Sequence, residues 1–216
     1  MAWNVKTIFD FMDFQIRKQV GSFITIQEGM DALDHAQLEK MEDDFRIYGI
    51  NQTIHDSLKP FKIIQYQFTS SSDGSVSFPS NYVHFLDGAF TVYGSTVNQI
   101  NFINGDEKAK VLSNQLRAIS LSNPVAEDNS TGFQLYPQST QTGFYNYLRR
   151  PAVPVYAFTQ VNRTITYDPN NSVQLEWQDN YIDNIIARAM AYLGINLSEN
   201  EVVQFSQLKQ QQTNSQ

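Results

Sequence analysis

The apolar residues of this chain repeat with two different periods, and each period occupies its own part of the sequence. Residues 1–58 and 173–211 show the three- and four-residue spacing of amphipathic helices, whereas residues 59–168 show the alternation typical of strands and contain one helical pattern. Such segregated blocks favour an α+β fold over one in which strands and helices alternate. We therefore expect an N-terminal helical hairpin and C-terminal helices that pack together, with a β-rich middle containing hairpins.

The N-terminal block predicts two main helices. The first covers residues 5–19, where apolar side chains recur on one face. Thr25 and Glu28 have the spacing of a capping box, so they begin a second, longer helix that runs to Gly49. A short third helix is expected at residues 52–58.

The C-terminal block predicts two further helices. Apolar residues mark one helix face over about residues 180–193. Asp179 is placed to cap the N-terminus of this helix, and Gly194 is placed to end it in the left-handed conformation. Ser198 opens a second capping box and a second helix, and residues 212–216 form a polar tail.

The β-rich middle opens with the clearest hairpin pattern in the sequence. Residues 64–68 and 76–78 alternate apolar and polar side chains on the two sides of a turn at residues 70–74. Two more strands are expected over residues 89–93 and 97–103, about a second turn. The middle block should therefore contain paired, antiparallel neighbours.

The remainder of the middle block gives weaker signals. We expect a helix over residues 106–119, an aromatic strand over 144–148 and an edge strand over 161–167. Prolines keep residues 151–156 extended. No linker is long enough to separate domains, so we expect one domain spanning residues 1–216.

Composition and charge argue against several classes of protein. Fifteen Lys and Arg residues against 22 Asp and Glu give a net charge of −7, which argues against a nucleic-acid reader with a basic footprint. Cysteine is absent, so disulfides and thiolate metal sites are excluded. No segment has the form of a signal peptide or approaches the roughly 20 apolar residues that span a bilayer. We expect a soluble, unprocessed protein without membrane contact.

Catalytic and metal-binding motifs are not found in the sequence. His35, His55 and His84 are scattered, and none has a second ligand at metal spacing. Phosphate-binding loops and nucleophile elbows are also missing. We therefore expect no enzymatic activity, no cofactor and no metal ion, and we assign no catalytic residue. An enzyme without a recognisable motif is the least favoured hypothesis.

Four residues are candidates for contacts between subunits. Arg149 and Arg150 follow an aromatic strand, and their guanidinium groups suit carboxylates of a neighbouring chain. The alternative is an intramolecular or exposed ion pair of little energetic weight. Tyr147 and Trp177 complete the set, since aromatic anchors carry much of the energy of protein interfaces. An amide-rich and aromatic carbohydrate-binding face would have a similar composition.

Several stretches resemble one known family when they are taken in order. They include Ile26-Gln-Glu-Gly-Met30, Ser57-Leu-Lys-Pro-Phe61, Val76-Ser-Phe-Pro-Ser-Asn-Tyr82, Ser122-Asn-Pro-Val125, Gln134-Leu-Tyr-Pro137, Tyr147-Leu-Arg-Arg-Pro-Ala-Val-Pro154, Leu175-Glu-Trp-Gln-Asp179 and Tyr192-Leu-Gly-Ile195. The chain resembles the head-to-tail connector, or ring, proteins of tailed bacteriophages, most closely those of crAss-like phages. The resemblance covers residues 5–209.

The resemblance implies a non-enzymatic virion protein, assembled in the host cytoplasm and located at the portal vertex. It implies a homo-oligomeric ring, a dodecamer, that lies below the portal, contacts the portal protein and adjacent tail or ring proteins, and joins capsid to tail. Genomic DNA would pass through the channel without sequence-specific binding, and an acidic lining would repel its phosphates. The alternative from another class is a glycan-binding or adhesion module of a phage or bacterial surface.

Overall fold

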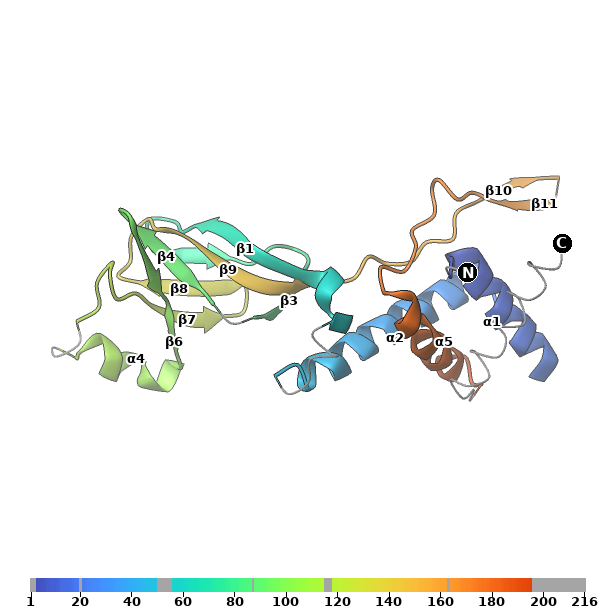
Figure 1. The fold of residues 1–216 in the computed structure, drawn as a ribbon, viewed down its shortest axis with the longest axis horizontal. Helices are drawn as coiled ribbons and strands as arrows, with labels where there is room; N and C mark the ends of the chain where they lie inside the picture. The colour runs from blue at the N-terminus through green and yellow to red at the C-terminus, as the bar shows by residue number, and fades with distance from the viewer. Residues whose placement is uncertain are drawn as a thin grey trace. The chain divides into compact units, whose positions relative to one another are not determined.

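The computed structural model describes residues 3–19, 21–49, 56–86, 88–114, 118–162 and 164–195 (Figure 1). The chain divides into two compact units. Residues 1–60 and 151–216 form the helical unit, and residues 61–150 form the β-unit. The chain therefore leaves the helical unit and later returns to it. The sequence patterns, which indicated a single domain, did not predict this division into two units.

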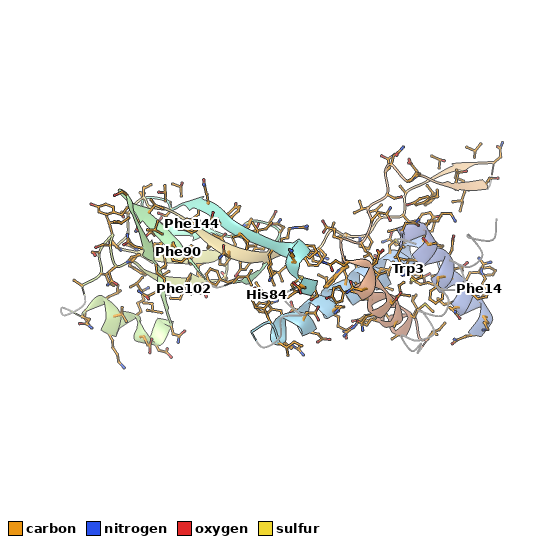
Figure 2. The ribbon with its side chains drawn as sticks, viewed as in Figure 1. Trp3, Phe14, His84, Phe90, Phe102 and Phe144 are labelled. Atoms are coloured by element: carbon orange, nitrogen blue, oxygen red, sulfur yellow. The ribbon has the colours of Figure 1, made fainter. Side chains whose placement is uncertain are left out.

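The helical unit is built from α1 (Val5–Gln19), α2 (Ile26–Arg46) and α5 (Asp179–Tyr192). Helix α2 packs against α5, and α1 contacts both. The Trp3 indole N–H adds a polar contact, because it donates to Asp183 Oδ1 of α5 at 2.9 Å (Figure 2). The α1 stripe predicted from the sequence, Ile8, Phe11, Met12 and Ile16, is buried together with Val5. The expected packing of N-terminal on C-terminal helices is thus confirmed.

The predicted capping box at the start of α2 is present. The Thr25 hydroxyl accepts from the Glu28 backbone N–H at 3.2 Å, and the Glu28 carboxylate accepts from the Thr25 backbone N–H at 2.8 Å. These bonds hold the pKa of Glu28 below its usual range, because they stabilise the ionised carboxylate. The helix ends at Arg46, three residues before Gly49.

The C-terminal helix matches its prediction except at the cap. Helix α5 begins at Asp179, so this residue lies in the first turn, and Gln178 occupies the N-cap position. The predicted Asp179 cap is therefore wrong, although an acidic side chain in the first turn still favours the helix dipole. Gly194 has φ of +84°, as a left-handed stop requires. The second C-terminal helix expected from Ser198, and the polar tail, lie outside the described residues.

The β-unit contains a five-stranded and a four-stranded sheet. The first has the order β1-β9-β4-β5, with β3 also paired to β9; its strands are β1 (Lys62–Thr69), β3 (Tyr82–Phe85), β4 (Phe90–Tyr93), β5 (Thr96–Gln99) and β9 (Thr142–Arg149). The second has the order β2-β8-β7-β6, with β2 (Ser75–Ser77), β6 (Asn101–Ile103), β7 (Val125–Asn129) and β8 (Gly132–Tyr136). Only the β6–β7 pair is parallel among these described pairs.

Aromatic rings from both sheets form the core of the β-unit. Tyr145 of β9 is fully buried, and its ring packs edge-on against Phe133 of β8 with centroids 5.8 Å apart. Phe68 of β1 contacts the same Phe133 ring at 5.4 Å. Outside this core, on the opposite face of β9 from Tyr145, Phe90 and Phe144 form a pair across β4 and β9 with centroids 5.3 Å apart (Figure 2). Burial raises the pKa of the Tyr145 hydroxyl well above its usual range.

The predicted first hairpin is wrong. Strand β1 pairs with β9, and β2 pairs with β8 of the other sheet. The intervening turn does form, since the Ser71 backbone N–H donates to Ser75 O at 3.0 Å and Gly74 has φ of +84°. The turn carries the chain from one sheet to the other, so that Phe68 and Val76 enter the same core from opposite sides.

Other strand predictions fare better. Strands β4 and β5 pair about the expected turn, but the expected strand over residues 97–103 divides at buried Ile100, and its second half, β6, joins the other sheet. The aromatic strand is confirmed as β9. Strand β7 includes Glu127, Asp128 and Asn129, and its pairing with β8 overrides the weak strand preference of these residues.

The helical segments between the main elements are short. Helix α4 (Gly105–Leu112) replaces the longer helix expected over residues 106–119 and has no buried residue. A 3₁₀ turn, η1 (Lys59–Phe61), precedes β1. Of the short helix expected at residues 52–58, only residues 56–58 are described. In the part of the chain described, no helix is long and apolar enough to cross a membrane.

We predict that Gly143→Ala destabilises the β-unit. A Cβ atom at this position in β9 would lie 2.1 Å from the Phe90 carbonyl oxygen and 2.6 Å from Phe68 Cζ. Overpacking a strand against a neighbouring backbone should lower the free energy of unfolding by about 3 kcal/mol, measured by urea denaturation. Gly49→Ala is the control, since nothing lies within 4 Å of a Cβ there. Equal stability of the two variants would contradict the close approach.

Candidate functional site

The segment between β9 and α5 contains a long run of exposed residues. We call residues 151–175 the arm. It contains two strands, β10 (Phe158–Val161) and β11 (Thr164–Tyr167), which pair only with each other in the described structure. At its base Val155 and Val173 exchange two backbone hydrogen bonds, at 3.1 and 2.9 Å. The base is thus closed as a narrow loop from which the two strands extend.

An aromatic and amide contact ties the base of the arm to α1. The Tyr156 ring packs against Phe9 of α1 at 5.4 Å and against Tyr167 at 4.9 Å between centroids. The Tyr167 hydroxyl accepts from Gln174 Nε2 at 3.0 Å, and Gln174 Oε1 accepts from the Val5 backbone N–H at 2.7 Å. Burial raises the pKa of the Tyr156 hydroxyl. The base is therefore fixed, together with Tyr167 at the end of β11. Residues 159–161 and 164–166 have no comparable anchor outside the two strands among the described contacts.

The paired strands β10 and β11, which we call the ribbon, expose apolar side chains to solvent. Phe158, Val161 and Ile165 are 43, 66 and 53% exposed, and every residue of β10 is exposed. A two-stranded sheet is at best marginally stable in water without a third layer or strand. The ribbon therefore has the properties of a segment that packs against another surface.

Each face of the ribbon has its own chemistry. The pairing places Phe158 opposite Tyr167 and Gln160 opposite Ile165, so these four side chains share one face. Threonines and Val161 occupy the other face. The residues of both strands carry no charge, and Arg163 lies between the strands in the sequence. Neutral, β-branched and aromatic surfaces of this kind match the desolvated centre of protein interfaces better than a face for an ionic ligand.

The predicted arginine pair lies at the end of β9. The Arg149 guanidinium lies over the Phe61 ring, 5.7 Å from its centroid, and its Nη1 donates to the Arg150 carbonyl at 3.3 Å. The Arg150 backbone N–H donates to Asn81 O at 2.7 Å, and its side chain is exposed. A contact of either arginine with a carboxylate of another chain stays a prediction.

The other two predicted contact residues are buried. Tyr147 is 3% exposed, and its hydroxyl donates to Asn81 Oδ1 at 3.1 Å inside the β-unit. Trp177 is 4% exposed and belongs to the helical unit. The structure thus brings Tyr147, Arg149 and Arg150 together on one strand, whereas Trp177 lies elsewhere. As placed here, neither aromatic ring offers a surface to a second chain.

Sequence reasoning missed the ribbon as a unit. It assigned an edge strand to residues 161–167 and included them in the β-rich middle, whereas they belong to the helical unit. The alternation of β-branched residues on both sides of Asn162 is the signal that could have revealed a hairpin. Asn162 has φ of 49°, a conformation that tight hairpin turns require.

A buried ionic centre lies inside the helical unit. Lys40 and Asp44 of α2 are 9 and 6% exposed, and Lys40 Nζ lies 3.0 Å from both carboxylate oxygens. Ser57 Oγ donates to Asp44 at 2.7 Å. Lys40 Nζ also lies over the rings of Trp177 and Tyr181, at 5.6 and 5.2 Å from their centroids. The centre joins α2 to the segment before η1 and to the start of α5.

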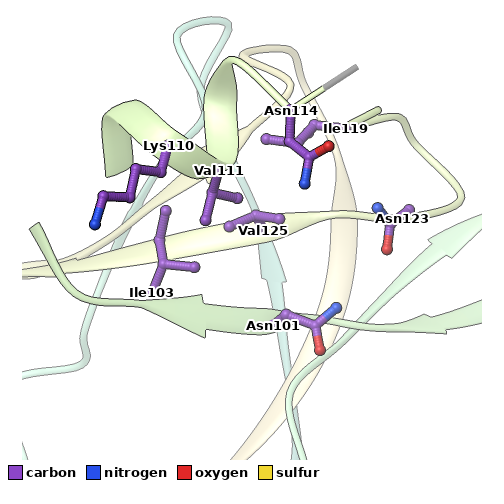
Figure 3. Close-up of a pocket in the computed structure, with 8 residues that line it drawn as sticks. All are labelled: Asn101, Ile103, Lys110, Val111, Asn114, Ile119, Asn123 and Val125. Atoms are coloured by element: carbon purple, nitrogen blue, oxygen red, sulfur yellow. The ribbon is translucent and has the colours of Figure 1, made fainter. Parts of the chain in front are cut away.

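A hollow of about 310 Å³ lies between α4 and the strands β6 and β7 (Figure 3). Three amides and a lysine line it together with four aliphatic side chains; the polar residues are Asn101, Lys110, Asn114 and Asn123, and the aliphatic residues are Ile103, Val111, Ile119 and Val125. Amides both donate and accept hydrogen bonds, so the lining offers partners for an uncharged polar ligand.

The comparisons with known proteins do not add a family to this geometry. No protein-family model matches the chain, and a search of curated proteins gives no match. Among the described residues, no group of three His, Asp or Glu side chains is placed to hold a metal ion. His35 lies on α2 and His84 on β3, whereas His55 is outside the described residues. The functional argument therefore depends on the exposed surfaces.

We predict that the Asp44→Ala substitution lowers the free energy of unfolding of the helical unit. Removal of one partner leaves Lys40 buried without its counter-ion, which should lower the free energy of unfolding by about 3–5 kcal/mol. Asp10→Ala is the control, because the Lys6–Asp10 pair is 46 and 44% exposed; its removal should cost about 0.2–0.5 kcal/mol. Chemical denaturation followed by far-ultraviolet circular dichroism measures both. A loss below 1 kcal/mol for Asp44→Ala would rule out a structural role for this ion pair.

Proposed function

We propose that this chain is a structural virion protein that forms a homo-oligomeric ring below the portal and joins the capsid to the tail. The observation that carries the proposal is the neutral ribbon of the arm, whose apolar side chains are 43–66% exposed at Phe158, Val161 and Ile165. In a head-to-tail ring each copy donates one arm and receives one. A closed ring therefore leaves no ribbon uncovered.

The energy available from the ribbon is appropriate for repeated contacts. Burial of an apolar side chain of this size contributes about 1.5–3 kcal/mol. Phe158 and Ile165 share one face and Val161 lies on the other. A partner that covers the first face therefore buries two partly covered side chains, which contribute on the order of 3 kcal/mol at each interface before the costs of association are subtracted. A single contact of this strength is weak, but closure of a ring repeats it at every subunit. The resemblance to connector proteins supports the same arrangement.

The proposal also covers the partners and the channel. The ring would contact the portal protein on one side and adjacent tail or ring proteins on the other, at the portal vertex of the virion. Genomic DNA would pass through the centre without sequence-specific binding during ejection. The net charge of −7 supports this role, because a lining of carboxylates repels phosphates. A ring whose inward residues are basic would contradict this part.

We predict that the triple variant Phe158→Ser, Val161→Thr and Ile165→Thr folds but loses self-association. The association constant should fall by about 100-fold or more, since ~1.4 kcal/mol corresponds to a factor of ten. Sedimentation velocity of the full chain, and negative-stain images of rings, measure the effect.

The matched control is Leu112→Ser, which removes a side chain of similar exposure, 44%, from α4. Unchanged assembly of the triple variant would contradict the role of the ribbon. A chain that stays monomeric both alone and with the portal protein of the same virion would contradict the ring itself.

The amide-lined hollow favours a second candidate, a glycan-binding or adhesion module. Its amides match hydroxyl groups, and its aliphatic side chains match the apolar face of a sugar ring. The ring proposal predicts no saturable binding of soluble oligosaccharides in titration calorimetry. Saturable binding that Asn101→Ala weakens about tenfold, which is ~1.4 kcal/mol, in a chain that is monomeric, would favour the second candidate. Asn170→Ala, an exposed amide in the turn after β11, is the control.

A further inference from the structure

Strand β1 has an open edge. It pairs with β9 along one side, and no described strand pairs with the other side. The Ser70 backbone N–H donates to Gln141 O at 2.8 Å, and ladder bonds alternate along antiparallel strands. The backbone N–H and C=O groups of Gln67 and Thr69 therefore face away from β9, and both residues are exposed. Such an edge is a template for another strand.

A bulge limits the usable length of this edge. The register of β1 shifts between Ile63 and Tyr66, where Gln65 has φ of 57° and its N–H donates to Asn146 Oδ1 at 2.8 Å. Bulges disrupt the regular row of backbone donors and acceptors. Regular pairing with a new strand is therefore possible from Tyr66 to Thr69, a stretch as long as the four-residue strand β10.

The free edge of the ribbon lies on β10. The Asp168 backbone N–H donates to Ala157 O at 2.9 Å, so the alternation turns the N–H and C=O groups of Phe158 and Gln160 away from β11. All four β10 residues are exposed. On β11, by contrast, Tyr167 is held by the base of the arm. Strand β10 is therefore the better donor of an additional pairing.

The two edges match in charge and in side chains. Residues 63–72 and residues 151–162 carry no charge, although the whole chain has a net charge of −7. Ile64, 64% exposed, lies two residues before the regular edge. Three other edge strands are less suitable for pairing with β10. Strands β2 and β6 have three residues each. Asn98 of β5 donates to Leu121 O at 3.4 Å, which places another segment beside β5.

We infer that β10 of one copy pairs with the outer edge of β1 in a second copy, so that the five-stranded sheet gains the ribbon as two further strands. Main-chain hydrogen bonds would supply much of the contact, as in other cases of strand addition. The inference rests on the proposed function, because it names the surface that receives the arm. It makes the contact heterologous, since the arm and the β1 edge are different surfaces, which is the geometry that rings require.

The absence of cysteine gives a direct test. The double variant Gln67→Cys with Gln160→Cys should form a ladder of disulfide-linked oligomers under mild oxidation, because docking brings two thiols from different copies together. An equimolar mixture of the two single variants should give a linked dimer only. Linkage should exceed that of either single variant by about tenfold or more, since docked groups reach millimolar effective concentrations. Thr69→Cys with Gln160→Cys is the second pair, in case one thiol geometry is unfavourable.

The control pair is Val97→Cys with Gln160→Cys, which places the first thiol on β5. Rings that link through Val97→Cys, and not through position 67 or 69, would overturn the inference and leave the ring proposal standing. Disulfides formed within one chain, with no change in mass on a non-reducing gel, would also overturn it. A chain without oligomers by sedimentation and without links in any variant would overturn both proposals.

Discussion

Strand β9 is the constraint on which the β-unit depends, because it pairs with β1 along one edge and with β3 and β4 along the other. Its Tyr145 and Tyr147 side chains enter the aromatic core, and Gly143 lets the backbone of β4 approach more closely than a Cβ would allow. These requirements occur within one run of eight residues. Strands β1, β3 and β4 are consequently placed by their pairing with β9, which is distant from them in sequence.

The end of β9 is also the point where the chain changes units. Arg150 is the last residue of the β-unit, and buried Pro151 begins the arm. The helical unit then holds the base of the arm through Tyr156 and Gln174, and its own helices are joined by the buried pair of Lys40 and Asp44. The proposed self-assembly depends on this fixed base and uncovered ribbon, since the ribbon has edges and apolar side chains that its own unit does not cover.

Local patterns predicted the elements that local interactions stabilise. The α1 stripe, the Thr25 and Glu28 capping box and the Gly194 stop all follow from contacts within a few residues. The turn at Ser71 was predicted correctly. The predicted first hairpin was wrong because the partners of β1 and β2 are distant in sequence. Among the candidate contact residues, Tyr147 and Trp177 have interface-like chemistry in the sequence, but burial is a property of the folded chain and removes them from the surface.

The sequence by itself determined the α+β class, the positions of the main helices and the alternating strands. These features depend on apolar periodicity and helix capping, which involve residues close together in the sequence. Only the tertiary structure decided which strands share a sheet, where the two units divide and which aromatic side chains stay exposed. Pairing between distant strands depends on how aromatic rings from both sheets fill one core. This packing cannot be predicted from residues that are close together in the sequence. For the same reason, the ribbon could be identified as a candidate interface only in the folded structure. The exposure of its side chains depends on which strands pair elsewhere in the chain.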